Sequence, residues 1–187
     1  GRGGAPPMVV LVARMLWDKG VGDFVAAAEL LRGRGVAGRF VLVGDPDLDN
    51  PAAVPVAQLR DWQARGVVEW WGRRGDVPAI LGAAAIFCLP TRYGEGIPKS
   101  LLEAGAAGLA LVATDTPGCR DVISDGENGV LVSPGDVSAL AASLERLLAQ
   151  PGLRERLGAA ARETVRRDFS VEQVCRETLA VYREVLG

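Results

Sequence analysis

The chain has 187 residues, 49% of them hydrophobic, which is enough to build a buried core in one globular domain. Its 21 basic and 23 acidic residues give a net charge of −2, so it lacks the basic excess of nucleic-acid-binding proteins, and we expect no nucleic-acid partner. It contains no histidine, which excludes nucleophilic sites built on Ser/His/Asp or Cys/His.

The cysteines and the apolar stretches predict neither a metal site nor a membrane span. Cys88, Cys119 and Cys175 are widely spaced and form no CxxC motif. Without histidine, they are best interpreted as reduced, buried thiols of a cytoplasmic protein. The longest charge-free apolar stretch, Ala79–Pro90, is too short to cross a bilayer. We therefore expect no metal, no bound cofactor and no transmembrane segment in this piece.

The first residues differ in composition from the rest. Residues 1–7 are rich in glycine and proline, and the chain begins with Gly1 rather than Met. We interpret residues 1–7 as a linker or cloning remnant and residues 8–187 as one domain taken from a longer protein. The alternative is a cloning scar in front of a complete protein.

Short runs rich in β-branched residues alternate with longer amphipathic stretches, the pattern of βαβ units in a parallel sheet. The predicted strands are Met8–Ala13, Arg39–Val43, Val67–Trp71, Ala85–Leu89, Ala110–Ala113 and Gly129–Val132. The predicted helices are Val21–Gly35, Val54–Arg65, Val77–Ala83, Pro98–Ala107, Val137–Ala149, Leu153–Arg167 and Val171–Leu186, with Pro151 and Gly152 separating two of them. We expect a Rossmann-like α/β fold, a doubly wound parallel six-stranded sheet with helices on both faces and extra helices at the C-terminal end.

The expected topology predicts where a ligand binds. With strand order 3-2-1-4-5-6, a crevice opens between strands one and four, beyond their carboxyl ends. The loops that border this crevice are Arg14–Gly20 and Pro90–Glu103. Both carry unusual concentrations of charge or glycine.

The first of these loops carries two cations suited to a diphosphate. Arg14 follows the strand, and Lys19 comes five residues later, near the start of a helix. Arginine offers a planar fork of donors, and lysine offers a compact charge. The alternative is that Arg14 pairs with Asp18 and that Lys19 is a solvated helix-end lysine, because weak surface ion pairs are common.

The second loop has the composition of an anion-binding helix start. Pro98 suits the first turn of a helix, so the free amides ahead of it face the crevice with the positive end of the helix dipole. Gly94 and Gly96 permit close backbone approach.

Two carboxylates accompany this loop. Glu95 lies within it, and Glu103 lies on the second turn of the helix, where it could accept from the hydroxyls of a ribose. Carboxylates next to a phosphate site are explained if they face sugar hydroxyls, and a nucleotide sugar presents both groups. The alternatives are a plain loop charge for Glu95 and a weak i,i+4 pair with Lys99 for Glu103.

A weaker signal follows the second and third strands. Gly44 and Asp45 come after one strand, and Gly72, Arg73 and Arg74 come after the other, where main chain and arginine could frame a base. No G-x-G-x-x-G motif and no Walker A motif is present, so dinucleotide and P-loop interpretations lack their glycines.

These motifs together resemble a known family. They are Arg14 with Lys19 and Gly20, Val43-Gly44-Asp45, Gly72-Arg73, Glu95 seven residues ahead of Glu103, and the turn Asp125-Gly126-Glu127-Asn128-Gly129. From Val9 onward the chain resembles the C-terminal, donor-binding domain of the family 4 retaining glycosyltransferases of GT-B architecture.

The resemblance implies roles for these residues. Arg14 and Lys19 would contact the donor diphosphate, Glu95 the hydroxyls of the transferred sugar, and Glu103 the ribose. Main-chain groups at Gly96 and Ile97 would add phosphate contacts. Such enzymes work without a bound metal, because the basic pair stabilises the leaving group.

This sequence departs from the common Glu-Gly-Phe-Gly form of the motif, having Ile97 and Pro98 instead, and Pro98 offers no main-chain donor. The variant resembles the subgroup that acts in bacterial surface polysaccharide and glycan assembly. The resemblance also implies that the N-terminal, acceptor-binding domain is a missing partner, and that the full protein could associate peripherally with the inner face of the membrane.

The sequence leaves the donor sugar, base, acceptor, linkage and oligomeric state open, although a UDP-sugar is the donor we expect. Alternative functions are a non-catalytic nucleotide-sugar binding module and half of an epimerase of the same architecture, and product analysis with an acceptor separates them. A flavodoxin-like domain would instead predict flavin absorbance.

Overall fold

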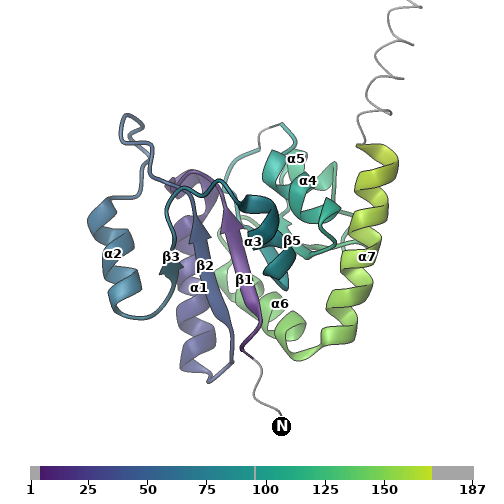
Figure 1. Ribbon diagram of the computed structural model, residues 1–187, viewed down its shortest axis with the longest axis horizontal. Coiled ribbons are helices and arrows are strands. Elements are labelled where there is room, and N and C mark those ends of the chain that lie inside the picture. Colours follow the sequence, from purple (N-terminus) through teal and green to yellow (C-terminus); the bar gives the residue numbers. More distant parts are fainter. Residues whose placement is uncertain (1–4, 95, 170–187) are drawn as a thin grey trace, which may run out of the picture.

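The computed structural model describes residues 5–94 and 96–169, and in this part the chain forms one parallel sheet of six strands (Figure 1). The strand order is β3-β2-β1-β4-β5-β6, as the sequence predicts. The strands are β1 (Met8–Val12), β2 (Arg39–Val43), β3 (Glu69–Trp70), β4 (Ile86–Leu89), β5 (Ala110–Thr114) and β6 (Val130–Val132). Because β1 pairs with both β2 and β4, the chain winds outward in opposite directions from β1.

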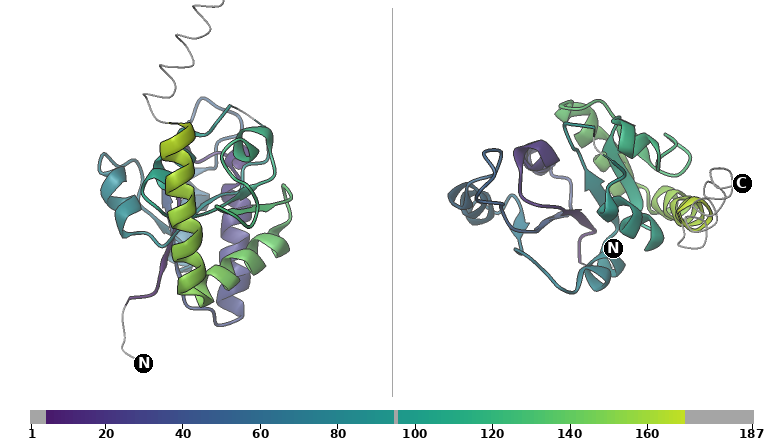
Figure 2. Two further views of the ribbon diagram at one scale, coloured as in Figure 1. Left: turned by 90° about the vertical axis from the view of Figure 1, so that its right-hand side faces the viewer. Right: turned by 90° about the horizontal axis from the view of Figure 1, so that it is seen from above.

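Helices connect the strands and cover both faces of the sheet, which makes the fold doubly wound (Figure 2). They are the short 3-10 helix η1 (Trp17–Lys19) and the helices α1 (Val21–Gly33), α2 (Val56–Ala64), α3 (Val77–Ala83), α4 (Lys99–Ala106), α5 (Pro117–Arg120), α6 (Val137–Ala149) and α7 (Pro151–Asp168). On one face α1 packs beside α6, and on the other α4 packs beside α7.

Alternate residues of the buried strands pack their side chains into two hydrophobic cores, one on each face of the sheet. Val9 and Leu11 of β1 pack with Phe24 of α1 and Leu144 of α6, whereas Val10 joins the second core. That second core includes Leu101 of α4 and residues of α3 and α7. A strand buried on both sides reads as a continuous apolar run, which is why β1, β4 and β5 were recognisable in the sequence.

The predicted boundaries lie within two residues of the observed ones, with identifiable causes for the differences. β3 is shorter than predicted because the Val67 amide donates to the Trp62 carbonyl at the end of α2 (3.0 Å) and is unavailable to the sheet. The two helices predicted on either side of Pro151 and Gly152 are separate, but the break falls at Gln150, and Pro151 and Gly152 belong to the second helix. α7 begins at Pro151, since proline is tolerated at the first helical position, where its missing N–H needs no acceptor.

Two short elements, η1 and α5, were not predicted, and the predicted helix Val171–Leu186 lies outside the described residues. No helix of the described part is long and apolar enough to cross a membrane. Cys88 and Cys119 are buried, as expected, and burial raises the pKa of the Cys88 thiol. Cys175 lies outside the described residues.

Candidate functional site

The loop after β1 places Arg14 at the carboxyl edge of the sheet, where it forms an ion pair. Arg14 Nη1 donates to Asp47 Oδ2 at 2.6 Å, and the two side chains are 59% and 35% exposed. The alternative partner considered from sequence, Asp18, is therefore not the one observed. Arg14 is held in position by a carboxylate that a competing anion could displace, because both groups remain open to solvent.

Asp47 reaches Arg14 because the loop after β2 runs beside the loop after β1. The Met15 amide donates to the Asp45 carbonyl (3.0 Å), and the Val54 amide donates to the Met15 carbonyl (2.9 Å). Gly44 makes this approach possible: its φ is +139°, and a Cβ there would lie 1.9 Å from the carbonyl oxygen of Ala13. Only glycine fits at this position.

The ends of β2 and β3 are joined in the same way. The Gly44 amide donates to the Gly72 carbonyl at 2.8 Å, and the Arg73 amide donates to Asp45 Oδ1 at 3.0 Å. The Trp70 indole N–H donates to the Gly44 carbonyl at 2.8 Å. The Asp45 carboxylate thus organises the turn after β3, which is a structural task that the sequence did not reveal.

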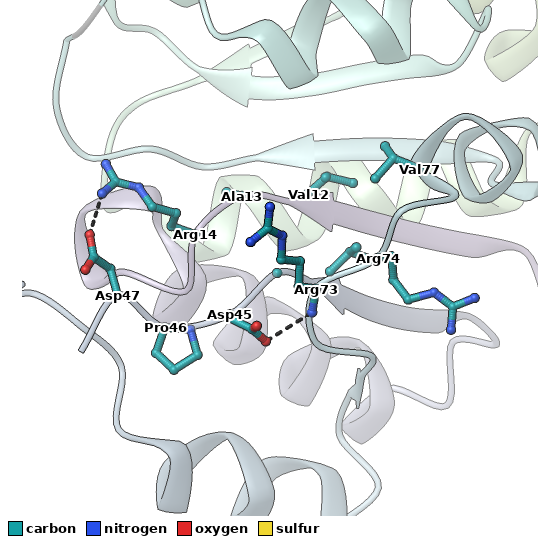
Figure 3. Close-up of a pocket in the computed structure, with 11 residues that line it drawn as sticks. Val12, Ala13, Arg14, Asp45, Pro46, Asp47, Arg73, Arg74 and Val77 are labelled. Atoms are coloured by element: carbon teal, nitrogen blue, oxygen red, sulfur yellow. Dashed lines mark hydrogen bonds and ion pairs between the residues drawn. The ribbon is translucent and has the colours of Figure 1, made fainter. Parts of the chain in front are cut away.

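A cavity of about 440 Å³ lies above the carboxyl ends of β1, β2 and β3 (Figure 3). Its lining consists of Val12, Ala13, Arg14, Val43, Gly44, Asp45, Pro46, Asp47, Arg73, Arg74 and Val77. Four of the residues predicted to bind the donor, Arg14, Gly44, Asp45 and Arg73, therefore line one cavity. Its volume lies within the range of small-molecule sites.

The two arginines after β3 have different surroundings. Arg74 donates twice to the Asp76 carboxylate (2.8 Å each) and lies over the Trp71 ring at 5.9 Å, and the bond to Asp76 raises the pKa of Arg74. In Figure 3 its guanidinium points away from Arg73, whose own guanidinium extends toward the end of β1. Arg73 is therefore the better placed of the two to meet a ligand in the cavity.

The loop after β4 is fastened to the loop after β1 rather than to the cavity. The Arg92 amide donates to the Asp18 carbonyl (2.8 Å), and the Thr91 hydroxyl donates to the same oxygen (3.1 Å). Gly20, with a φ of +74°, packs so closely on Pro90 that a Cβ there would lie 1.8 Å from its carbonyl oxygen. Lys19, immediately before Gly20, is thereby brought to the side of the crevice where the second loop begins.

Within this second loop, the structure places the remaining predicted residues outside the cavity lining. Gly94 packs against Pro117, and Gly96 and Ile97 are exposed. Pro98 is the N-cap of α4, one residue before the position predicted for it. The first amides of a helix have no intrahelical acceptor, which suits the start of α4 to an anion, and the predicted phosphate contacts of the amides ahead of Pro98 stay a prediction. Glu95 lies outside the described residues.

Glu103 takes part in the i,i+4 pair considered as an alternative. Lys99 Nζ lies 3.4 Å from Glu103 Oε1, and the two side chains are 88% and 41% exposed. Such a pair contributes only about 0.3–0.5 kcal/mol and does not prevent Glu103 from accepting a ligand hydroxyl. A ribose role for Glu103 therefore stays a prediction.

Sequence reasoning missed Asp47, Asp23 and Arg92. The first pairs with Arg14, and the other two form an ion pair between α1 and the loop after β4. The signal available for Asp23 was its place on the apolar side of the predicted helix, four residues before Ala27, because a carboxylate buried there needs a partner. No cluster of three or more His, Cys, Asp or Glu side chains suited to a metal ion occurs in the part of the chain that the structure describes.

Fold and site together define a class: a doubly wound α/β domain with a cationic cavity beyond its central strands. Comparison with known proteins is specific about the family. Residues 6–150 match the family described as glycosyl transferases group 1. The chain belongs to this family, and it corresponds to the C-terminal, donor-binding domain of family 4 retaining glycosyltransferases of GT-B architecture.

Relatives with curated functions extend over nearly the whole chain. N,N'-diacetylbacillosaminyl-diphospho-undecaprenol alpha-1,3-N-acetylgalactosaminyltransferase from Campylobacter jejuni is 34% identical over 181 residues, covering 96% of this chain and 45% of its own length. Alpha-D-kanosaminyltransferase from Streptomyces kanamyceticus is 32% identical and is covered to 46%. The chain thus spans about half the length of the curated relatives it matches.

Solved structures agree on the fold. Sucrose-phosphate synthase from Thermosynechococcus elongatus superposes with a TM-score of 0.83 at 26% identity, over 97% of this chain and 46% of that one. Anabaena HepE, solved in complex with UDP, gives a TM-score of 0.82 at 22% identity, over 95% of this chain and 49% of that one.

Proposed function

We propose that this chain is the donor half of a retaining hexosyltransferase that binds a nucleotide-diphosphate sugar, with a UDP-sugar as the expected donor, in bacterial surface glycan or polysaccharide biosynthesis. The observation that carries the proposal is the cavity that brings Arg14, Gly44, Asp45 and Arg73 together at the switch point of a group 1 glycosyltransferase fold. The Campylobacter relative, whose acceptor is a lipid-linked diphospho-sugar, supports the glycan setting.

The proposed binding mode follows the two halves of the crevice. The nucleoside occupies the cavity, framed by Gly44, Asp45 and Arg73. The diphosphate extends past Arg14 toward Lys19 and the start of α4, where cations and helix amides favour negative charge.

The transferred sugar then meets the loop of Gly94, Glu95, Gly96 and Ile97, which leads into Pro98. This order places the charged part of the donor between the two loops that border the crevice. Glu95 accepts from the sugar hydroxyls, and main-chain groups of Gly96 and Ile97 meet the phosphates.

In the proposed reaction, the bond from the sugar's anomeric carbon to the phosphate oxygen breaks, and a bond from that carbon to the acceptor oxygen forms on the same face. The acceptor's proton passes to the departing phosphate oxygen. Arg14 and Lys19 stabilise the charge that develops on the diphosphate, which is the task a divalent cation would otherwise perform. No residue of this chain needs to act as a nucleophile.

Glu103 gives a prediction about the ribose. Replacing Glu103 by glutamine keeps the shape and a neutral acceptor oxygen but removes the charge that strengthens the hydrogen bonds from a diol, so UDP affinity is expected to fall about fivefold, less than the loss of a whole charge-assisted hydrogen bond. Affinity for 2′-deoxy-UDP should fall less, since it offers one hydroxyl fewer.

Lys99→Gln provides the matched control for Glu103, because it removes the i,i+4 partner without touching the carboxylate. Calorimetric titration of both nucleotides measures the effects. Equal losses for UDP and 2′-deoxy-UDP would make Glu103 a structural helix residue.

The half-enzyme proposal has its own test. The 187-residue chain is expected to bind a nucleotide sugar but transfer nothing, with transfer appearing when an N-terminal acceptor domain is covalently joined to it and the crevice can close. Product analysis with lipid-linked and soluble sugar acceptors measures this. Robust transfer by the 187-residue chain would refute the proposal, and conversion of the donor to its epimer would favour the epimerase alternative. A cytoplasmic location, with the full protein at the inner face of the membrane, accords with this function.

A further inference from the structure

A buried carboxylate and a half-exposed guanidinium join the start of α1 to the second loop of the crevice. Asp23 lies in the first turn of α1 with a side chain only 6% exposed, and Arg92, two residues after Pro90, is 52% exposed. Arg92 donates from Nε and Nη2 to the two Asp23 oxygens, at 3.0 and 2.6 Å. This two-point contact holds both side chains, and therefore both backbones, in one relative orientation.

The pair differs from an ordinary surface ion pair. A carboxylate as buried as Asp23 is costly unless it is compensated, so its partner is required rather than optional. The helix dipole at the start of α1 supplies part of that compensation, and Arg92 supplies the rest. Hydrogen bonding to Asp23 raises the pKa of Arg92, which keeps the guanidinium charged.

The surrounding contacts show which parts the pair connects. Asp23 follows Lys19 by four residues, with the left-handed Gly20 between them, and Arg92 begins the glycine-containing loop that leads to α4. The Thr91 carbonyl below it accepts from the Thr114 hydroxyl at 2.5 Å, which anchors the base of this loop to the end of β5. Beyond Arg92, Gly94 packs against Pro117, whereas Gly96 and Ile97 are exposed. The Arg92 side chain therefore ties the start of this loop to α1.

We propose that Asp23 and Arg92 are positioning residues that set the distance between Lys19 and the β4–α4 loop, so that the site favours nucleoside diphosphate sugars over nucleoside monophosphates. The proposal rests on the proposed function and deepens it. Neither residue lines the cavity, so their effect passes through position and not through contact with the nucleoside. A nucleoside monophosphate contacts only the cavity, whereas a nucleoside diphosphate sugar also contacts the β4–α4 loop.

The test compares UDP-glucose with UMP by calorimetric titration of Asp23→Asn, Arg92→Gln and the double variant. UDP-glucose affinity is expected to fall about tenfold in each, near the low end for the loss of one charge-assisted hydrogen bond, whereas UMP affinity changes less than about twofold. The double variant should lose no more than either single one, because both changes remove the same interaction. Asp115→Asn is the matched control, since it breaks an exposed Asp–Arg pair of 2.8 Å after β5.

Amide hydrogen exchange without ligand provides the second measurement. In Arg92→Gln, the amide of residue 92, which donates to the Asp18 carbonyl, is expected to exchange about tenfold faster, and in Asp115→Asn it should not change. Arg92→Lys, which keeps the charge but not the fork, should fall between wild type and Arg92→Gln in both measurements.

The outcomes separate this proposal from the function on which it rests. Equal losses for UDP-glucose and UMP, or unchanged exchange in Arg92→Gln, would overturn the positioning role. If the wild type binds no nucleotide sugar, the proposed function fails, and the exchange measurement still decides whether the pair holds the loop. If either single variant does not fold, the double variant carries the decision, because it leaves no buried carboxylate without its partner.

Discussion

Replacing Arg14 or Lys19 by alanine is expected to weaken nucleotide-diphosphate binding by about 1.5–3 kcal/mol, the value of a charge-assisted hydrogen bond, or about 10- to 150-fold in Kd. The fold should be retained, because the Arg14 side chain is 59% exposed and contributes nothing to either core. Calorimetric titration with UDP, alongside circular dichroism of each variant, measures the effect.

Asp47→Asn tests the same arginine by removing the charge of its partner. In the structure, the Asp47 carboxylate occupies the Arg14 guanidinium at 2.6 Å, so removing its charge removes a competitor for the diphosphate. UDP affinity should be unchanged or higher in this variant. If Arg14→Ala and Lys19→Ala both bind UDP as tightly as the wild type, the two cations have no part in the site.

Gly20→Ala is expected to destabilise the domain by about 2–4 kcal/mol, combining the cost of a left-handed backbone for alanine with that of overpacking. Gly20 has a φ of +74°, and an added Cβ would lie 1.8 Å from the Pro90 carbonyl oxygen, which is backbone and cannot move aside alone. Urea unfolding followed by circular dichroism measures the change in free energy.

Gly33→Ala is the control at the other end of the same helix, where an added Cβ meets nothing within 4 Å. It should leave stability unchanged or raise it slightly, by the gain in helix propensity. A Gly20→Ala variant as stable as Gly33→Ala would show that the contact between the two crevice loops is not as tight as the structure indicates.

The sheet was predictable because its information is local. Each buried strand is a short apolar run, each helix has its own amphipathic period, and the handedness of βαβ crossovers leaves few ways to order the strands. Once the order is known, the loops after β1 and β4 must border the crevice. The positions of Arg14 and Lys19 beyond β1 follow from this reasoning.

The partners of these residues were not predictable, because they come from distant parts of the chain. Arg14 and Asp47 are 33 residues apart, and Asp23 and Arg92 are 69 residues apart. Charges nearby in the sequence were plausible alternative partners. Asp18 was the wrong partner for Arg14, whereas Lys99 was the correct partner for Glu103. Periodicity and turn chemistry say which element a residue belongs to but not which loop will lie beside it.

Because the sequence does not show which loops lie side by side, it also did not show that the predicted site residues fall into two groups. From sequence, the candidates after the first and fourth strands border one crevice, and those after the second and third strands lie at the same carboxyl edge as a weaker signal. The structure instead places Gly44, Asp45 and Arg73 with Arg14 in a cavity over β1 to β3, and places Gly94, Gly96, Ile97, Pro98 and Glu103 outside its lining. Side-chain volume and loop packing decide this, and neither has a signature in the sequence.

The most direct test of nucleotide-sugar binding is a calorimetric titration of the 187-residue chain against UDP, GDP, ADP and CDP sugars in the presence of excess chelator. Because Arg14 and Lys19 take the place of a cation, we expect one class of nucleotide sugar, UDP sugars, to bind at one site per chain with the chelator present, and Arg14→Ala to weaken that binding about 10- to 150-fold. Failure of every nucleotide sugar to bind, or binding that strictly requires magnesium or manganese, would contradict the account.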